Sequence, residues 1–323
     1  MAAPAEKMAQ SLENLRKLQN EQGIAVVKTG DLSRTHKERL IKNGFLREVI
    51  KGWYISTAPE ISAGDTTSWY TSFWYFVSVY FHSRFGDDWC LSPEQSLSLH
   101  SGNFAVPRQL LVRSPKAGNN SITLLYGTSF FDLKLEIPEK SSLVTLQNLQ
   151  VYSLTDGLIA CGSDFFARNP TDARTCLSLV RDPSPLLAKL LNGGRSVIAG
   201  RLAGAFRNIG NSNIADEIIT TMKRAGYDVR EDDPFTGKVD VPIFYRETSP
   251  YSNRIKLMWH HMRSETFDTF PRTAGRIVDP DQYLEKVEEQ YFDDAYNSLS
   301  IEGYKVTAEL IERVRDGNWN PET

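Results

Sequence analysis

The chain of 323 residues contains only three cysteines and five histidines, and neither type is clustered into a site. Cys90, Cys161 and Cys176 form no Cys-x-x-Cys pair and have no histidine at metal-ligand spacing. An odd, widely spaced set of this kind argues against a disulfide framework and against a structural zinc site. We therefore expect reduced, buried thiols, no metal site and a cytoplasmic protein.

Long apolar runs are also missing. The most apolar stretch, Trp69–Phe81, is about 13 residues long and is interrupted by Thr71, Ser72 and Ser78, whereas a transmembrane helix needs about 20 apolar residues. The first residues lack the apolar centre of a signal peptide. The sequence thus predicts no membrane partner, and it predicts a buried aromatic helix from Thr66 to Phe85.

Neither sign of charge dominates the chain. The 37 Lys and Arg residues stand against 40 Asp and Glu residues, and the apolar content of 41% is typical of a folded protein. The alternation of patterns described below predicts an α+β fold in four regions. These are a winged helix-turn-helix (1–60), a mixed α/β domain (61–165), a helical region (166–235) and a mostly helical C-terminal region (236–323).

The first 60 residues begin with helical patterns. Leucines spaced three residues apart predict a helix over residues 9–22. Ser33 is a suitable N-cap for a further helix, which Gly44 would terminate. A short helix over residues 26–32 is predicted between these two, as a helix-turn-helix requires.

Two β-prone runs follow these helices. Residues 45–50 and 53–56 are separated by Lys51 and Gly52, and two residues ending in glycine are the signal of a tight hairpin turn. Three helices followed by a hairpin make up a winged helix-turn-helix, so this is the module that we predict.

Basic residues concentrate in this module. Seven Lys and Arg residues stand against three acids between Lys28 and Ser56, a surplus of about four on a chain that is acidic overall. In a winged helix the second helix of the motif enters the major groove and the hairpin meets the phosphate backbone. The residues predicted to contact DNA are Arg34, Thr35, Lys37 and Lys51. The alternative is a protein-interaction module whose basic face is solvated.

The stretch from Leu40 to Ser56 contains two glycine-led motifs, Gly-Phe-Leu-Arg at residues 44–47 and Gly-Trp-Tyr at residues 52–54. It resembles the N-terminal module of AbiEi-type antitoxins, whose pattern is a helix, Gly-x-Leu, a basic residue and Gly-x-Tyr. The resemblance covers about 50 residues. It implies a transcription-regulator-like module that binds DNA, in a protein that restrains a toxin partner.

The second region combines the aromatic helix with short strands. Proline and glycine-rich breaks separate runs that are apolar or that alternate between apolar and polar residues. The predicted strands are residues 109–113, 121–126, 130–137 and 143–153. A mixed α/β domain follows from this pattern, and its sheet also fits the antitoxin resemblance.

The third region is predicted to be helical. Its helices are expected at residues 173–180, 185–191, 197–208 and 214–225. Gly200 and Gly204 lie four residues apart, and we expect them to permit close packing of their helix against a neighbour. The polar, turn-rich segment 226–237 is predicted to be the main linker.

The histidines and serines of the chain do not form a recognisable catalytic site. His82 and His100 have no second ligand at metal spacing, and the adjacent His260 and His261 would point about 100° apart on a helix. The sequence also lacks the Gly-x-Ser-x-Gly elbow of many hydrolases. We therefore expect structural histidines and no catalytic residue in this chain.

Near the C-terminus, apolar residues at steps of three and four predict a helix that ends at Gly303. Ser298 and Glu302 lie four residues apart, so their side chains share one face. The helix dipole disfavours a carboxylate at a helix C-terminus, and a cationic partner would offset that effect. The alternative is that Glu302 is a solvated helix-end acid.

Residues 298–303, Ser-Leu-Ser-Ile-Glu-Gly, match the pattern Ser/Thr-x-x-x-Glu-Gly/Asn. This is the inhibitory-helix motif of Fic-family proteins, which the chain resembles over roughly residues 249–319. Fic enzymes transfer AMP from ATP to a protein hydroxyl with Mg²⁺. Their inhibitory glutamate pairs with a catalytic-motif arginine and blocks the ATP γ-phosphate. By position, Glu302 would be the inhibitory acid, Ser298 the motif hydroxyl and Gly303 the turn after it.

The catalytic motif of the Fic family is absent from this sequence. None of the five histidines is followed by Pro-Phe or by Gly-Asn-Gly-Arg, so the chain alone has neither the general base nor the ATP-clamping arginine. We expect it to bind no cofactor itself and to transfer no AMP.

Three hypotheses about function follow. The first is the regulatory N-terminal region of a Fic protein, whose catalytic core lies in a continuation of the chain or on another chain. The second is an AbiEi-like regulator that binds DNA and a toxin. The third is an enzyme whose site the sequence does not reveal.

Overall fold

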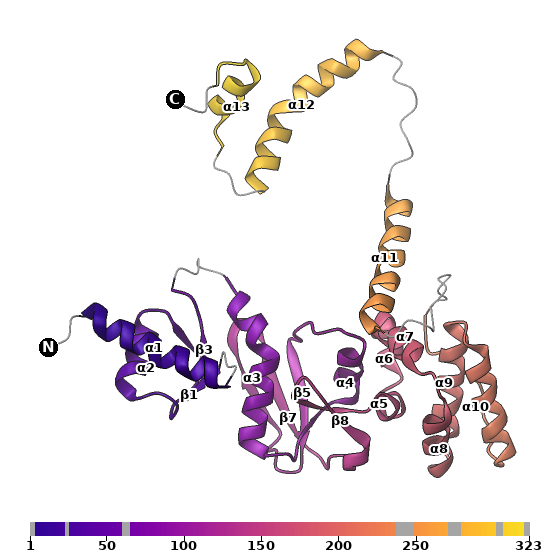
Figure 1. The fold of residues 1–323 in the computed structure, drawn as a ribbon. Helices are drawn as coiled ribbons and strands as arrows, with labels where there is room; N and C mark the ends of the chain where they lie inside the picture. The colour runs from indigo at the N-terminus through magenta and orange to yellow at the C-terminus, as the bar shows by residue number, and fades with distance from the viewer. Residues whose placement is uncertain are drawn as a thin grey trace. The chain divides into compact units, whose positions relative to one another are not determined.

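The structure is a computed structural model, and it describes residues 4–22, 26–59, 65–236, 249–270, 279–301 and 306–319. It divides into two compact units, Met1–Met262 and Arg263–Thr323. Its helices and small sheets belong to the α+β class that the sequence predicts (Figure 1). Within the described ranges, no helix has both the length and the apolar character needed to cross a bilayer.

The N-terminal module consists of two helices and a three-stranded antiparallel sheet of order β1-β3-β2. Its elements are α1 (Pro4–Gln22), β1 (Val26–Lys28), α2 (Arg34–Lys42), β2 (Leu46–Ile50) and β3 (Trp53–Ser56). The predicted hairpin is present, and Gly52 has the positive φ of 85° that its tight turn requires.

The short helix predicted over residues 26–32 is wrong. Val26 and Val27 pair with Ile55 and Tyr54 as strand β1, and a turn leads from that strand into α2. A three-residue strand has no periodicity of its own, and its conformation follows from pairing with β3. The hairpin is therefore confirmed, whereas the helix-turn-helix is not.

Side chains alternate across this sheet, so its two faces enter different cores. One face contributes Val27 and Tyr54 to a small core with Leu15 and Leu40. The opposite face contributes Ile55, together with Val26 and Val49, to the large aromatic core of the next region. The aromatic core therefore contains residues from both sides of the domain boundary that was predicted at residue 60.

The middle region is built around α3 (Thr67–Phe85), the aromatic helix that the sequence predicts. Trp69, Phe73, Phe76 and Phe81 on this helix are fully buried. Figure 1 shows α3 lying between the N-terminal sheet and the sheet that contains β5 and β7. Residues 72–81, in the middle of this helix, are all buried or half-buried, whereas exposed residues are confined to its two ends. The apolar stretch of the sequence is therefore accounted for by burial inside the protein.

The sheet beside α3 has the order β4-β5-β7-β6, with β5 and β7 parallel and the other pairs antiparallel. Strands β8 and β9 form a separate hairpin. The elements are β4 (Cys90–Leu91), α4 (Pro93–His100), β5 (Gln109–Ser114), β6 (Asn120–Thr123), β7 (Ser129–Lys134), β8 (Leu143–Leu146) and β9 (Leu149–Tyr152), with 3₁₀ turns at Leu125–Gly127 and Lys140–Ser142. The predicted strands at 109–113, 121–126 and 130–137 correspond to β5, β6 and β7, although β6 ends at Thr123. The single strand predicted over 143–153 is wrong, because Gln147 and Asn148 have positive φ and turn the chain between β8 and β9. Helix α4, which begins at its N-cap Ser92, was not predicted.

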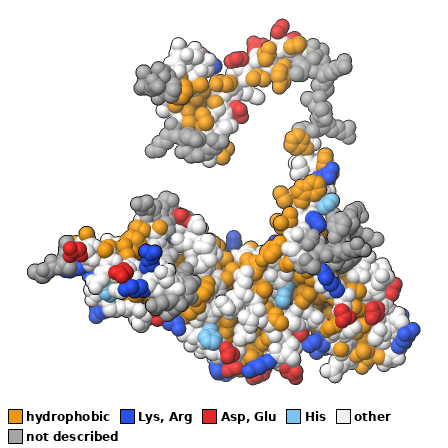
Figure 2. Space-filling model, in the orientation of Figure 1, with side chains coloured by type: hydrophobic (Ala, Val, Ile, Leu, Met, Phe, Trp, Pro, Cys, Tyr) orange, Lys and Arg blue, Asp and Glu red, His pale blue; other side chains and the backbone are white. Residues whose placement is uncertain are grey.

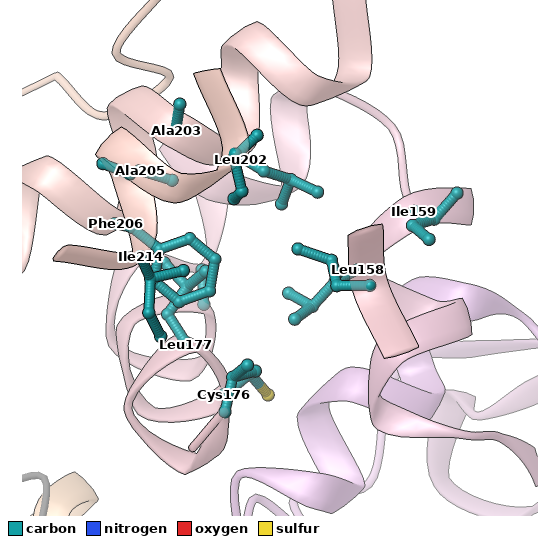
Figure 3. Close-up of a cluster of buried hydrophobic side chains, with 14 of the residues drawn as sticks. Leu158, Ile159, Cys176, Leu177, Leu202, Ala203, Ala205, Phe206 and Ile214 are labelled. Atoms are coloured by element: carbon teal, nitrogen blue, oxygen red, sulfur yellow. The ribbon is translucent and has the colours of Figure 1, made fainter. Parts of the chain in front are cut away.

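Helices α5 to α10 share one core, which includes the four helices predicted for this region. They are α5 (Leu154–Ala160), α6 (Asp164–Arg168), α7 (Pro170–Leu179), α8 (Ser184–Asn192), α9 (Ser196–Asn208) and α10 (Ser212–Arg224). Figure 3 shows Leu177 of α7, Phe206 of α9 and Ile214 of α10 converging in this core.

The segment predicted as the main linker is instead packed on α9 over residues 226–236. A Cβ on Gly200 would lie 1.9 Å from the carbonyl oxygen of Arg230, and one on Gly204 would lie 2.1 Å from that of Asp232. The Asp232 amide also donates a hydrogen bond of 3.2 Å to the Gly200 carbonyl. The glycine pair therefore packs closely against a neighbour, as predicted, and that neighbour is the supposed linker.

The remaining helices are α11 (Pro250–Thr269), α12 (Pro280–Ile301) and α13 (Ala308–Arg315). In the first unit, the start of α11 is held by buried Asn253 and Leu257. In the second unit, Thr307 caps α13 by accepting a hydrogen bond of 3.3 Å from the Leu310 amide.

Candidate nucleic-acid interface

The inner face of α2 is fixed to α1 by polar contacts. The Asn14 amide donates to His36 Nε2 at 3.1 Å, so the opposite ring nitrogen carries the proton and donates to Ser11 Oγ at 2.9 Å. Arg39 donates to the Lys7 carbonyl oxygen and to Ser11 Oγ, both at 2.7 Å. These contacts set the rotation of α2 and leave its opposite face exposed.

Arg34 and Thr35 lie in the first turn of α2, and both are exposed. Arg34 Nε donates to Glu38 Oε1 at 2.7 Å, and this hydrogen bond is the largest cause that raises the pKa of Arg34. Both side chains of the pair are mostly in solvent, where water and salt screen such pairs strongly. A phosphate oxygen can therefore replace the Glu38 carboxylate as the partner of Arg34.

Lys37 and Lys51 connect α2 with the hairpin. The Lys37 ammonium lies 5.5 Å from the centroid of the Tyr54 ring in β3. Lys51 is exposed at the tip between β2 and β3, and it makes no ion pair with any residue that the structure describes. The Thr29 amide donates to the Gly52 carbonyl at 2.9 Å and holds this tip in place.

The other basic residues of the module have contacts that the sequence count does not reveal. The Lys28 ammonium donates to Ser83 Oγ at 2.9 Å and lies 4.8 Å from the centroid of the Trp53 ring. The Arg47 guanidinium hydrogen-bonds the Tyr126 hydroxyl and lies 5.1 Å from the centroid of its ring. These two cations join the module to the middle region.

The residues of the inhibitory-helix motif lie at the end of α12. This helix continues to Ile301, and Ser298 is exposed on it. Glu302 and Gly303 lie outside the described residues, so the expected pairing of Glu302 with a cation stays a prediction.

The cysteines and histidines of the first unit have structural environments. All three cysteines are free and buried, and burial raises the pKa of Cys90 and of Cys161 to about 12. His100 Nε2 donates to the Tyr152 carbonyl oxygen at 2.7 Å, and burial lowers the pKa of this histidine. His82 Nδ1 lies 3.3 Å from a carboxylate oxygen of Asp87 at the surface.

Two carboxylates, those of Asp132 and Asp172, are buried, and each is paired with an arginine. Asp132 lies 2.6 Å from Arg84 Nη1 and accepts a hydrogen bond of 2.7 Å from the Asn120 amide. Asp172 is paired with Arg254 of α11. In the ranges that the structure describes, no three His, Cys, Asp or Glu side chains come together as a metal site would require.

Comparison with protein-family models, with curated proteins and with solved structures gave no match. The fold itself defines an α+β protein. Its N-terminal module presents the four predicted contact residues on the start of α2 and on the tip of the adjoining hairpin.

Proposed function

We propose that this chain is a regulatory protein that binds double-stranded DNA through its N-terminal module. The contact surface consists of the first turn of α2, with Arg34, Thr35 and Lys37, and the hairpin tip, with Lys51. This role agrees with the implied AbiEi-like regulator, and the three free cysteines are compatible with the cytoplasm.

The observation that carries the proposal is that some basic residues of the module make structural contacts, whereas others are exposed to solvent. Lys28, Arg39 and Arg47 make contacts that hold the module together or join it to the middle region. Arg34 and Lys51 extend into solvent from elements that those contacts fix in place. Exposed cations on rigid elements are what phosphate contacts require, because little ordering then opposes binding.

The test is a fluorescence anisotropy titration of the full chain with a labelled duplex from upstream of its own gene, repeated over a range of salt concentrations. The logarithm of affinity should fall linearly with the logarithm of salt, with a slope of about 0.9 for each phosphate contact. The double substitution Arg34→Ala and Lys37→Ala should reduce that slope by about 1.8.

A matched control removes the same charge from another part of the chain. Lys223 and Arg224 are exposed at the end of α10, and their replacement by alanine should leave affinity and slope unchanged. If the α2 variant and this control lose the same affinity for DNA, the loss reflects the net charge of the chain and not a specific contact surface. Binding that is unaffected by the α2 variant would exclude the proposed surface.

A second candidate function concerns α12. We propose that this helix restrains a Fic catalytic core, in cis or in trans, which would supply the binding residues for ATP and Mg²⁺. The supporting observation is that α12 is helical up to Ile301 with Ser298 exposed, the conformation that the motif needs as it approaches Glu302.

This second candidate is tested by adding the chain to a Fic core and measuring AMP transfer from labelled ATP. The wild-type chain should suppress transfer, and Glu302→Gly should restore it. Glu289→Gly, which alters an exposed acid elsewhere on α12, serves as the control and should still suppress. Equal transfer with the wild-type chain and with Glu302→Gly would leave Glu302 a solvated acid.

A further inference from the structure

An apolar groove of about 500 Å³ lies within the second unit, between α12 and α13. Its lining is entirely apolar or aromatic: Tyr291, Ala295, Leu299, Val306, Leu310, Ile311, Val314 and Trp319. Figure 2 shows hydrophobic side chains gathered over these two helices. The groove shares no residue with the proposed DNA surface.

The spacing of the lining residues explains why the groove is continuous. Tyr291, Ala295 and Leu299 follow at steps of four on α12 and therefore form one stripe. On α13, Ile311 is buried, but Val314 is 46% exposed, and Trp319 beyond the helix is 48% exposed. Apolar side chains collected in one concave surface are typical of a binding site, unlike single exposed ones.

Helix α12, which forms one side of the groove, is acidic overall. This helix carries six acids and one lysine: Asp281, Glu285, Lys286, Glu288, Glu289, Asp293 and Asp294. Glu288 precedes Tyr291 by three residues and Ala295 by seven, so it lies on the groove face. None of these acids forms an ion pair with a residue in the described ranges. With six acids and one lysine, α12 has a net charge of about -5.

We propose that the groove binds a basic amphipathic helix of another protein. The apolar side of that helix would enter the groove at positions i, i+3 or i+4, and i+7, which is the usual mode of helix-in-groove recognition. Its Lys and Arg residues would face the acids of α12. From Tyr291 to Leu299 the groove has room for about two helical turns, since a helix rises 1.5 Å per residue.

Charge selects this occupant over a second copy of the chain. Two copies joined through the groove would bring together two α12 helices that each carry six acids and one lysine, and like net charges oppose association. A basic helix, by contrast, is attracted electrostatically to acidic α12. The proposal is independent of DNA binding, and it shares helix α12 with the second candidate function.

The experiment measures binding of a fluorescein-labelled peptide to the full chain at physiological salt. The peptide carries leucine at helical i, i+3, i+4 and i+7 positions and lysine elsewhere. Two further peptides serve as controls: one with the same composition in scrambled order, and one with glutamate in place of every lysine. We expect saturable binding of the first peptide only. Equal binding of the scrambled peptide, or binding of the glutamate peptide, would overturn the proposal.

A pair of matched variants locates the binding surface. Val314→Gln should weaken binding of the basic peptide about tenfold, the loss expected for one buried aliphatic contact. Val144→Gln changes a residue of similar exposure, 40% against 46%, outside the groove and should have no effect. If both variants bind the basic peptide with equal affinity, the groove is not its binding site. Glu288→Gln should weaken binding and reduce its salt dependence.

Sedimentation of the chain alone over a range of concentrations tests the other occupant. We expect the distribution of sedimentation coefficients to be the same for the wild-type chain and for Val314→Gln. Concentration-dependent dimers that Val314→Gln abolishes would assign the groove to a second copy and overturn the proposal.

Discussion

Replacement of Gly200 by alanine tests the packing of the segment 226–236 against α9. Gly200 lies inside α9 (Ser196–Asn208), where alanine is ordinarily preferred over glycine by about 1 kcal/mol. From the sequence alone, Gly200→Ala would therefore be expected to stabilise the protein. The structure predicts the opposite sign, because the added Cβ would lie 1.9 Å from the Arg230 carbonyl oxygen.

The size of the destabilisation by Gly200→Ala follows from the movement of the Arg230 carbonyl that the substitution forces. The carbonyl must retreat by roughly 1 Å before the contact reaches 3.0 Å, the lower limit for real Cβ atoms. That movement breaks the hydrogen bond from the Asp232 amide, a loss of about 1 kcal/mol. It also loosens the packing of buried Val229 and Phe235, and overpacking of a core costs about 2 kcal/mol. After the gain in helix propensity, we expect a net destabilisation of about 2 kcal/mol.

The assay is urea denaturation combined with hydrogen exchange, since the two compact units need not unfold together. Peptides from 226–236 and from α9 should exchange faster in Gly200→Ala than in the wild type. Gly30→Ala is the control, because a Cβ there meets no atom within 4 Å. If Gly200→Ala is as stable as the wild type and its exchange is unchanged, the close packing described for this segment is wrong.

Three further predictions concern buried groups. Iodoacetamide at pH 8 should label none of the three cysteines in the folded chain and all of them in urea, because burial holds their pKa values far above this pH. Because burial lowers the pKa of His100, the unfolded chain binds more protons near pH 6. Stability should therefore fall as the pH drops below about 6.5, and His100→Gln should flatten this part of a denaturation profile. Arg254→Ala leaves the buried Asp172 carboxylate without its cation, so we expect a loss of about 3 kcal/mol and faster hydrogen exchange at the start of α11, whereas Arg254→Lys should retain part of the stability.

The sequence was most informative where a local pattern agrees with the final packing. The aromatic composition of Thr67–Phe85 predicts a buried helix, and Lys51-Gly52 predicts the hairpin, because a buried helix centre and a positive φ each require particular residue types. It failed at Val26–Lys28, where pairing with β3 decides the conformation. It also failed at residues 226–236, whose polar composition is typical of a loop although Val229 and Phe235 are buried.

The candidate site was likewise predicted from local composition in part, whereas the rest of it depends on tertiary contacts. Composition identified the basic module, in which Arg34, Thr35 and Lys51 are exposed and Lys37 is half-buried. Their contact with DNA stays a prediction. No pattern in the sequence separates these residues from Lys28 and Arg47, whose partners lie 55 and 79 residues away along the chain. The groove in the second unit was likewise hidden, since it depends on how α12 and α13 are brought together.

The two-sided burial of the N-terminal sheet limits how this protein can be divided. Val26, Val49 and Ile55 belong to the same core as the aromatic residues of α3. A fragment cut near residue 60 would expose these side chains to water, and such a fragment is expected to aggregate. A fragment chosen for the DNA-binding test proposed above should therefore extend through the middle region. The shared core, together with the contacts of Lys28 with Ser83 and of Arg47 with Tyr126, holds the module against α3 and the middle region, so the predicted boundary at residue 60 does not separate independent parts.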